Sequence, residues 1–362
     1  MHVFDYSWLK EDVPADLIGI TNIIPDLKAR DLLRRSENEE TLARPRQTAM
    51  IESVKGSNAI EGIVTTAKRL TALVRDGDKP VSHAEEEILG YKMALSEIYH
   101  EDFDADLSKP LLKHFHRLLL SPVSSEAGQY KKQNNRIQER DENGKLTVRF
   151  VPVKAKDTPG AMEQWILAWN EWRQNTGINC LFLIPCVVLD FLCIHPFTDG
   201  NGRLSRLITI VMLQQAGFDI SRYISLEARI NEYKYGYYQS LRESSVGWHE
   251  NRNTYYPFIT YFLRILYACY REMDEKFIES QVRMLPKHQQ VENVLLNSFV
   301  PVSKADVMRR LPHISVTTVE KVMADLLREA HSKDRDLSQR AVQSKINLKR
   351  QDPESSVTEN LR

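Results

Sequence analysis

HPFTDGNGRLSR, residues 195–206, is the stretch around which the chain is organised. Residues 181–194 before it are apolar almost all round, which predicts a helix buried in the middle of a domain. Residues 204–215 after it again have helical spacing, and Gly217 is suited to end that second helix. Two core helices therefore flank a short loop that carries a histidine, a carboxylate, glycines and arginines.

The residue types in this loop predict a phosphate-binding site. Gly200 and Gly202 allow positive φ, so the backbone N–H groups at the start of the second helix can turn toward one anion. Arg203 and Arg206 lie one helical turn apart and can reach the same side of that helix. A carboxylate beside phosphates needs a hard cation between them, which predicts Mg²⁺ at Asp199.

His195 ends the buried helix beside this anion site. It is therefore placed to take a proton from an incoming nucleophile. Each fragment alone has an ordinary structural interpretation, since a histidine after an apolar helix is usually a core or cap residue and Asp-Gly-Asn-Gly is usually a tight turn. The complete string favours the functional interpretation.

The stretch matches the signature His-x-Phe-x-(Asp/Glu)-Gly-Asn-Gly-Arg-x-x-Arg at each defined position, and the sequence thereby resembles the Fic family of AMP transferases. Ser205 stands where many members carry glycine. The resemblance implies that His195 is the general base, that Asp199 holds Mg²⁺ and that Phe197 anchors the loop in the core. The implied nucleotide-binding residues are Gly200, Asn201, Gly202, Arg203 and Arg206.

The resemblance also implies a fold and a reaction. The fold is mainly α, a Fic-type helical bundle with a small β-hairpin flap. The reaction moves AMP from Mg·ATP to a Ser, Thr or Tyr hydroxyl of a protein, with release of pyrophosphate. Nothing in the signature reads a base, so the preference for ATP is borrowed from the family.

A second motif lies upstream, at the end of a segment with helical spacing over residues 46–62. Glu61 would lie in the last turn of this helix, where the dipole disfavours a negative charge, although exposed glutamates are common at helix ends. Residues 57–62 also resemble the (Ser/Thr)-x-x-x-Glu-(Gly/Asn) inhibitory motif of one class of Fic proteins. The resemblance implies that Ser57 and Glu61 form an inhibitory element and that Glu61 pairs with Arg206 in competition with the γ-phosphate of ATP.

Asn143-Gly144, between a polar run and the alternating residues 146–150, predicts a β-hairpin. An ordinary surface hairpin is the simpler interpretation of this pattern alone. Fic proteins have a flap at this position that holds the target, and an exposed edge strand can pair with an extended peptide. The tyrosine-rich residues 233–241 resemble the Tyr-Tyr-x-x-Leu region that borders the nucleotide pocket, although helical aromatic stripes are more often core.

We expect four regions along the chain. They are an N-terminal helical region over 1–110, a Fic catalytic core over 111–275, a helix-turn-helix-like domain over 283–331 and a polar, disordered tail over 332–362. The third region resembles the winged-helix domains often appended to Fic domains, but no alternating hairpin follows residue 330. Acidic residues in the expected recognition helix, 315–330, leave DNA binding and a helical interaction module equally open.

Composition excludes several classes of protein. Hydrophobic residues make up 42% of the chain, which is typical of a globular protein, and Lys+Arg and Asp+Glu number 49 each, so no global charge favours nucleic acid or membranes. No stretch reaches the roughly 18 consecutive apolar residues of a membrane span, and the N-terminus lacks the pattern of a secretory signal. Four cysteines without a Cys-x-x-Cys pair predict reduced core thiols. We expect a cytoplasmic protein.

Two other functions stay open at this level. One is removal of AMP, with Glu61 activating water. The other is a DNA-binding regulator in which the Fic fold senses a ligand. The partners considered are a protein target along the flap, the chain itself as a target of self-modification, DNA, and a second copy in a homodimer.

Overall fold

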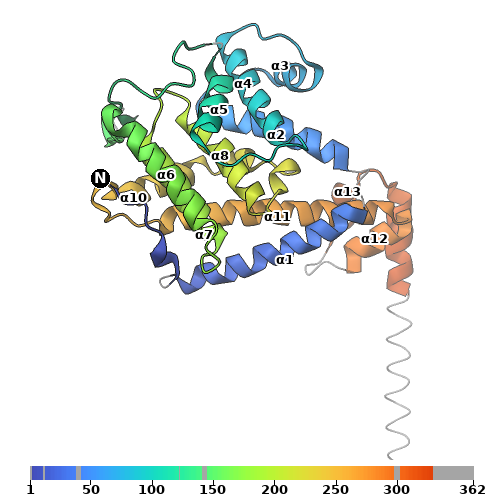
Figure 1. Ribbon diagram of the computed structural model, residues 1–362. Coiled ribbons are helices and arrows are strands. Elements are labelled where there is room, and N and C mark those ends of the chain that lie inside the picture. Colours follow the sequence, from blue (N-terminus) through green and yellow to red (C-terminus); the bar gives the residue numbers. More distant parts are fainter. Residues whose placement is uncertain are drawn as a thin grey trace, which may run out of the picture. The chain divides into compact units, whose positions relative to one another are not determined.

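The computed structural model describes residues 2–10, 13–37, 42–121, 123–140, 145–296 and 302–328 (Figure 1). Helices dominate these residues, and the sheet among them is one antiparallel hairpin of β1 (Ile137–Arg140) and β2 (Leu146–Phe150). The predicted mainly α fold with a small hairpin is therefore confirmed. The expected turn at Asn143-Gly144 lies outside the described residues.

The chain divides into two compact units, residues 1–275 and 276–362. The helices up to the central loop are η1 (Ser7–Lys10), α1 (Ala15–Glu37), α2 (Ala43–Ile60), α3 (Ala67–Thr71), η3 (Ala72–Asp76), α4 (His83–Ile98), α5 (Lys109–Leu120), η4 (Ala155–Asp157), α6 (Thr158–Trp172) and α7 (Cys180–Ile194). Those after it are α8 (Asn201–Gln215), η5 (Ile220–Arg222), α9 (Leu226–Glu232), α10 (Lys234–Ser245), η6 (Trp248–Glu250) and α11 (Tyr256–Met284).

Helix α7 is the centre of the first unit. Its side chains are buried on every face because the sequence is apolar all round, and it packs against α6 and α8 (Figure 1). Asn179 caps its start by accepting a hydrogen bond from the Leu181 N–H (2.9 Å). Trp165 of α6 donates its indole N–H to the carbonyl of Val187 (2.8 Å). These contacts fix the start of α7 and hold its middle against α6.

The polar exception within α7 is Asp190, which is fully buried. It accepts hydrogen bonds from the hydroxyls of Tyr6 (2.6 Å) and Tyr255 (2.9 Å) and from the indole of Trp248 (2.7 Å). Burial raises the pKa of this carboxyl to about 7, against the effect of its three donors. One side chain of the central helix thus holds the N-terminal segment and the segment before α11 together.

Helix α2 lies beside α9 at backbone contact distance. A Cβ built on Gly56 would lie 2.6 Å from the nitrogen of Ala228 and 2.7 Å from the carbonyl oxygen of Glu227, so only glycine permits this approach. Ser53 donates a hydrogen bond across the same contact to Ser225 (2.9 Å). The close packing sets where the end of α2 lies relative to the central loop.

The β-hairpin is joined to α10 and to the turn after it. Glu139 of β1 pairs with Arg242 of α10. His249 stacks on Phe150 of β2, with ring centroids 5.4 Å apart, and hydrogen-bonds the carbonyl of Val151 (2.8 Å). Both strands are therefore held close to the α10 side of the first unit.

The second unit begins inside α11, upstream of the expected boundary at residue 283. It contains α12 (Lys287–Leu296), α13 (Lys304–Arg310) and a helix over residues 316–328. Its buried core is formed by Val291, Val307, Leu311, Ile314, Val319 and Val322. The expected wing and the tail over 332–362 lie outside the described residues, and DNA binding by this unit stays a prediction.

Two further expectations concern the whole described part of the chain. Cys180, Cys186 and Cys193 are free thiols, and Cys186, Cys193 and Cys269 are buried. Among the described helices, none combines the length and the apolar character that crossing a membrane requires.

Candidate active site

His195 is the first residue after α7 and adopts a left-handed backbone conformation (φ 50°, ψ 62°). Its ring Nδ1 lies 3.3 Å from the carbonyl oxygen of Leu192, which assigns the proton to Nδ1 and leaves Nε2 as a proton acceptor. Burial lowers the pKa of the His195 imidazole to about 4. The ring is therefore neutral at neutral pH, the state that a general base requires.

Two side chains that sequence reasoning missed hold the turn around His195. Lys131 donates from Nζ to the carbonyl of Ile194 (3.1 Å) and to the side chain of Asn135 (2.8 Å). Asn135 in turn donates from Nδ2 to the carbonyl of Phe197 (3.2 Å). Burial lowers the pKa of Lys131 to about 8. Their carbonyl acceptors come from a distant segment, so no local pattern in the sequence announces them.

Phe197 is fully buried, and the ring of His116 from α5 stacks on it with centroids 3.8 Å apart. The Nε2 of His116 donates to the carbonyl of Asp199 (3.0 Å), and its Nδ1 accepts from the Gly128 N–H (2.7 Å). Burial lowers the pKa of His116, which favours the neutral form that both bonds need. Phe197 and His116 together hold the loop against α5.

The start of α8 presents free backbone donors. Gly200 has φ 75°, and the first helical hydrogen bond runs from the Leu204 N–H to its carbonyl (2.9 Å), so the N–H groups of residues 201–203 precede the helical ladder. No side chain caps this helix. A helix start of this kind attracts anions.

Two polar side chains of the loop, Asn201 and Asp199, differ in their hydrogen bonds and in their exposure to solvent. The amide of Asn201 bonds both the N–H (3.0 Å) and the carbonyl (2.8 Å) of Phe197, so it braces the loop rather than facing outward. Asp199 is 77% exposed at its side chain, and its Oδ1 accepts from the Gly200 N–H (2.6 Å). Asp199 is thus the accessible carboxylate of the loop.

Arg206 is buried and bound to the end of α2. Its Nε donates to the Ser57 hydroxyl (2.8 Å), and its Nη2 donates to the Ser57 carbonyl (2.9 Å) and to Oε1 of Glu61 (2.8 Å). Although burial by itself lowers the pKa of Arg206, the charge of Glu61 raises it. Within the described residues, its Nη1 is buried without an acceptor. That donor could bind an oxygen of a ligand.

Arg203 has a different partner. Its Nη1 lies 2.6 Å from Oε2 of Glu87 on α4, and its Nη2 lies 3.9 Å from Oδ2 of Asp199. Its side chain is 1% exposed. Glu87 was not among the residues predicted from sequence.

Glu61 follows directly on the last residue of α2, and Gly62 takes the left-handed conformation that ends the helix (φ 80°). The hydroxyl of Tyr238 donates to the carbonyl of Ile60 (3.3 Å), which satisfies one of the last helical carbonyls. A Cβ built on Gly202 would lie 2.3 Å from Oε1 of Glu61. The carboxylate of Glu61 therefore lies against the anion-attracting start of α8.

A cavity of about 260 Å³ joins these parts. His195, Gly202 and Glu61 line it together, whereas the other predicted site residues lie outside its lining. The remaining wall is formed by Ile137, Gln138, Arg149, Phe150, Leu189, Leu192, Cys193, Tyr237, Tyr238, Leu241 and Ser245. The wall of the cavity thus combines polar side chains with aromatic and apolar ones, which suits a nucleotide.

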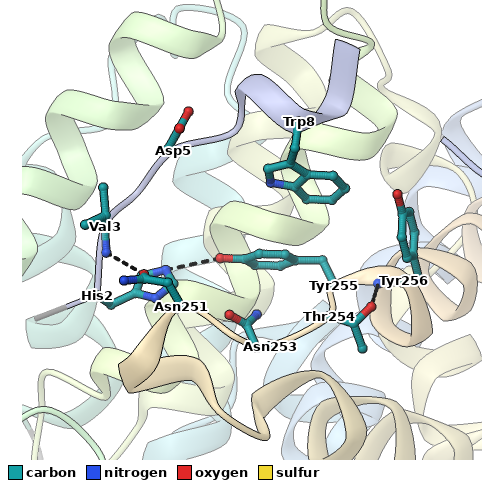
Figure 2. A pocket seen from close by; sticks show the side chains of 9 residues that line it. All are labelled: His2, Val3, Asp5, Trp8, Asn251, Asn253, Thr254, Tyr255 and Tyr256. Atoms are coloured by element: carbon teal, nitrogen blue, oxygen red, sulfur yellow. Dashed lines mark hydrogen bonds between the residues drawn. The ribbon is translucent and has the colours of Figure 1, made fainter. Parts of the chain in front are cut away.

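A larger cavity of about 410 Å³ lies elsewhere in the first unit (Figure 2). Its wall is formed by His2, Val3, Asp5, Trp8, Asn251, Asn253, Thr254, Tyr255 and Tyr256. Trp8 and Tyr255 stack there with centroids 5.6 Å apart (Figure 2). None of the residues of the 195–206 loop lines it, so size alone does not identify the site.

The family model that matches this chain is that of the Fic/DOC family, over residues 106–213. Residues 106–213 are a Fic/DOC family domain. The Fic domain includes the 195–206 loop and the β-hairpin, and α2 with Glu61 lies outside the matched range.

Curated proteins with similar sequences are also Fic proteins by name. A protein adenylyltransferase Fic of Nematostella vectensis is 29% identical over 195 residues, which is 49% of this chain and 40% of that protein. One of Drosophila grimshawi is 25% identical over 222 residues, covering 54% of this chain and 42% of that protein. The chain thus spans about two fifths of the length of these curated relatives.

Solved structures show the same fold over more of the chain. A Fic family protein from Desulfovibrio desulfuricans has a TM-score of 0.61 at 23% identity and covers 86% of this chain and 88% of its own. A Fic domain containing signaling protein from Bacteroides thetaiotaomicron has a TM-score of 0.57 at 20% identity, covering 69% and 95%. The Fic-type helical fold predicted from the sequence is therefore confirmed.

Proposed function

We propose that this protein transfers AMP from Mg·ATP to a hydroxyl of a protein and that Glu61 inhibits the transfer in cis. The observation that carries the proposal is the shared wall of one cavity. His195, the start of α8 at Gly202 and the carboxylate of Glu61 meet there. The curated relatives named protein adenylyltransferase Fic support the same reaction.

In the proposed reaction, Nε2 of His195 takes the proton of the attacking Ser, Thr or Tyr hydroxyl. The hydroxyl oxygen forms a bond to the α-phosphorus, and the bond from that phosphorus to the bridging oxygen of pyrophosphate breaks. The lowered pKa of His195 keeps its ring ready to accept a proton at neutral pH. The N–H groups at the start of α8 and the unpaired Nη1 of Arg206 would stabilise the phosphate oxygens.

Asp199 would hold Mg²⁺. Its carboxylate is a hard oxygen ligand with an exposed side chain, and no group of three or more His, Cys, Asp or Glu side chains in the described part of the chain is arranged for a metal. This donor set fits Mg²⁺, which is commonly held by one or two carboxylates together with substrate phosphates and water. When bound, the ion would offset the charge of the phosphates.

Inhibition follows from where the carboxylate of Glu61 lies. It takes one donor of Arg206 and lies against Gly202, where a terminal phosphate would have to approach. Two anions cannot share these donors, because their charges repel each other at short range. The nucleotide would therefore be kept from the pose needed for transfer while Glu61 stays paired.

The test is incorporation of α-labelled AMP by the purified full chain. We expect Glu61→Gly and Glu61→Gln to label more than wild type, and His195→Ala in the Glu61→Gly background to abolish labelling. Glu52→Gln is the matched control, because it removes a charge from the same helix without touching Arg206. Equal labelling by wild type, Glu61→Gly and Glu61→Gln would remove the inhibitory role, and labelling that survives His195→Ala would remove the proposed mechanism.

Removal of AMP is a second candidate, favoured by the fact that Glu61 lines the same cavity as His195. A carboxylate there could orient water toward a phosphodiester bound in the cavity. The two functions predict opposite effects of one change. If Glu61→Gly stops release of AMP from a modified protein, Glu61 is catalytic; if it raises labelling, Glu61 is inhibitory.

A further inference from the structure

The wall of the cavity of about 260 Å³ contains a positively charged side chain, Arg149, to which no role has yet been given. Arg149 of β2 lines the cavity together with His195 and the tyrosines of α10. It comes from the hairpin and not from the 195–206 loop, so the signature gives no hint of it. What Arg149 binds can be inferred from the geometry of the hairpin, from the charges near Arg149 and from the other residues that line the cavity.

A β-bulge places Arg149 in the cavity wall. Ile137 of β1 pairs with Phe150, and Gln138, the next residue, pairs with Val148, so Arg149 is the extra residue on β2. A bulge puts two consecutive side chains on nearly the same side of a strand and re-aims one of them. Arg149 and Phe150 accordingly both line the cavity, although they are neighbours in the sequence.

The guanidinium of Arg149 lacks an anionic partner in the described part of the chain. No hydrogen bond or ion pair from a described residue reaches it, and Glu139, whose charge is felt at Arg149, is paired with Arg242. Burial lowers the pKa of Arg149, which is the effect of a cation withdrawn from water without full compensation. An anion bound in the cavity would offset this cost.

The position of Arg149 within the cavity selects which anion. Arg149 lines the cavity together with His195, and the α-phosphorus has to lie beside His195 in the proposed transfer. Glu61, in contrast, lies at the start of α8, where the terminal phosphates are expected. The phosphate expected beside both His195 and Arg149 is therefore the α-phosphate.

We infer that Arg149 binds the α-phosphate of the adenine nucleotide and is a further substrate-binding residue of this site. The inference rests on the proposed function. It places the hairpin in direct contact with the nucleotide, in addition to its expected role in holding the target. Because the α-phosphate is the part of ATP that remains in AMP, Arg149 would bind the nucleotide before and after pyrophosphate leaves.

The test compares AMP with adenosine, two probes that differ by this phosphate. Binding of each is measured by calorimetry on the full chain, as wild type, Arg149→Gln and Arg149→Lys. Hydrogen bonds to charged groups contribute roughly 1.5–3 kcal/mol, so we expect Arg149→Gln to weaken AMP binding about 10- to 100-fold. We expect adenosine binding to stay the same and Arg149→Lys to be intermediate for AMP.

Arg136→Gln is the matched control, because Arg136 is an exposed arginine beside β1 that does not line the cavity. Thermal unfolding of each variant checks the fold. Equal losses for AMP and adenosine would mean that Arg149 only packs against the ligand, and no loss for AMP would mean that the guanidinium serves another anion, such as an acidic target residue. Either result overturns the inference alone. Failure of wild type and Glu61→Gly to bind ATP or AMP would remove the proposed function with it.

Discussion

Arg203 and Arg206 lie one turn apart on α8, and both are buried against a carboxylate from another helix. Their partners differ. Glu87 comes from within α4 and its side chain is 18% exposed, whereas Glu61 follows the end of α2, is 32% exposed and lines the cavity. A carboxylate within a packed helix is held toward its partner by the side chains around it, whereas one at a helix end has more room to turn away. We therefore expect the first pair to stabilise the fold and the second to control the site.

The largest expected effect separates the two arginines by stability. Arg203→Ala removes a buried guanidinium and leaves the largely shielded Glu87 carboxylate without its partner, and breaking a buried pair typically costs about 3–5 kcal/mol. Arg206→Ala costs less, because the partly exposed Glu61 can turn into water. The free energy of unfolding in urea measures both. A larger loss for Arg206→Ala would contradict the division into a structural pair and a regulatory one.

Glu87→Gln tests the same division from the acidic side. We expect it to lower the free energy of unfolding by about 1.5–3 kcal/mol, since the neutral amide can no longer form an ion pair with the buried guanidinium of Arg203. We expect no gain in AMP labelling, in contrast to Glu61→Gln. A rise in labelling with Glu87→Gln would mean that Arg203 is inhibited in the same way as Arg206.

Gly56→Ala disturbs the regulatory pair from a distance. The added Cβ would lie within 2.7 Å of α9 backbone atoms, so α2 has to shift, at a cost of about 1–3 kcal/mol for overpacking. Because Glu61 ends the same helix, we expect labelling to rise as well. Gly19→Ala in α1 is the matched control, since its Cβ meets nothing within 4 Å. Lower stability without a rise in labelling would show that the position of α2 does not set the inhibition.

The smallest effect is on the pH dependence of kcat/KM. Burial is the main cause that lowers the pKa of His195 to about 4, Lys131 and Arg149 act in the same direction, and Glu61 opposes them. The base is protonated only below that pKa, so we expect kcat/KM to stay level from pH 7 to 5 and to fall toward pH 4. The fall should move to lower pH in Glu61→Gln and not in Glu87→Gln. A fall near pH 6.5, the usual value for histidine, would contradict this.

The sequence predicted the centre of the fold because its local pattern is strong. An apolar run, a glycine-rich loop and a second helix at 181–215 are confirmed as α7 and α8, and the hairpin is confirmed as β1 and β2. The boundaries were less accurate. The expected helix over 46–62 ends at Ile60.

The site was predictable where it depends on neighbours in the chain and not where it depends on tertiary contact. Helical spacing puts Arg203 and Arg206 on related faces, but only the packing of α4 and α2 decides that their partners differ. His116 and Lys131 act through backbone atoms of a distant loop, which no spacing rule reports. Asp190 was the available signal for one such contact, since an acid inside an apolar helix needs buried donors.

The hydroxyl of Tyr238 couples nucleotide binding to the release of Glu61. Tyr238 donates a hydrogen bond to the carbonyl of Ile60 at the end of α2, directly before Glu61. It also lines the cavity in which the adenine base of the nucleotide is expected to bind. The adenine base and the carboxylate of Glu61 would then both depend on the position of Tyr238. Binding of the nucleotide would therefore change the free energy of the pairing between Glu61 and Arg206. Such coupling is reciprocal: the factor by which release of Glu61 tightens nucleotide binding is the factor by which bound nucleotide favours that release.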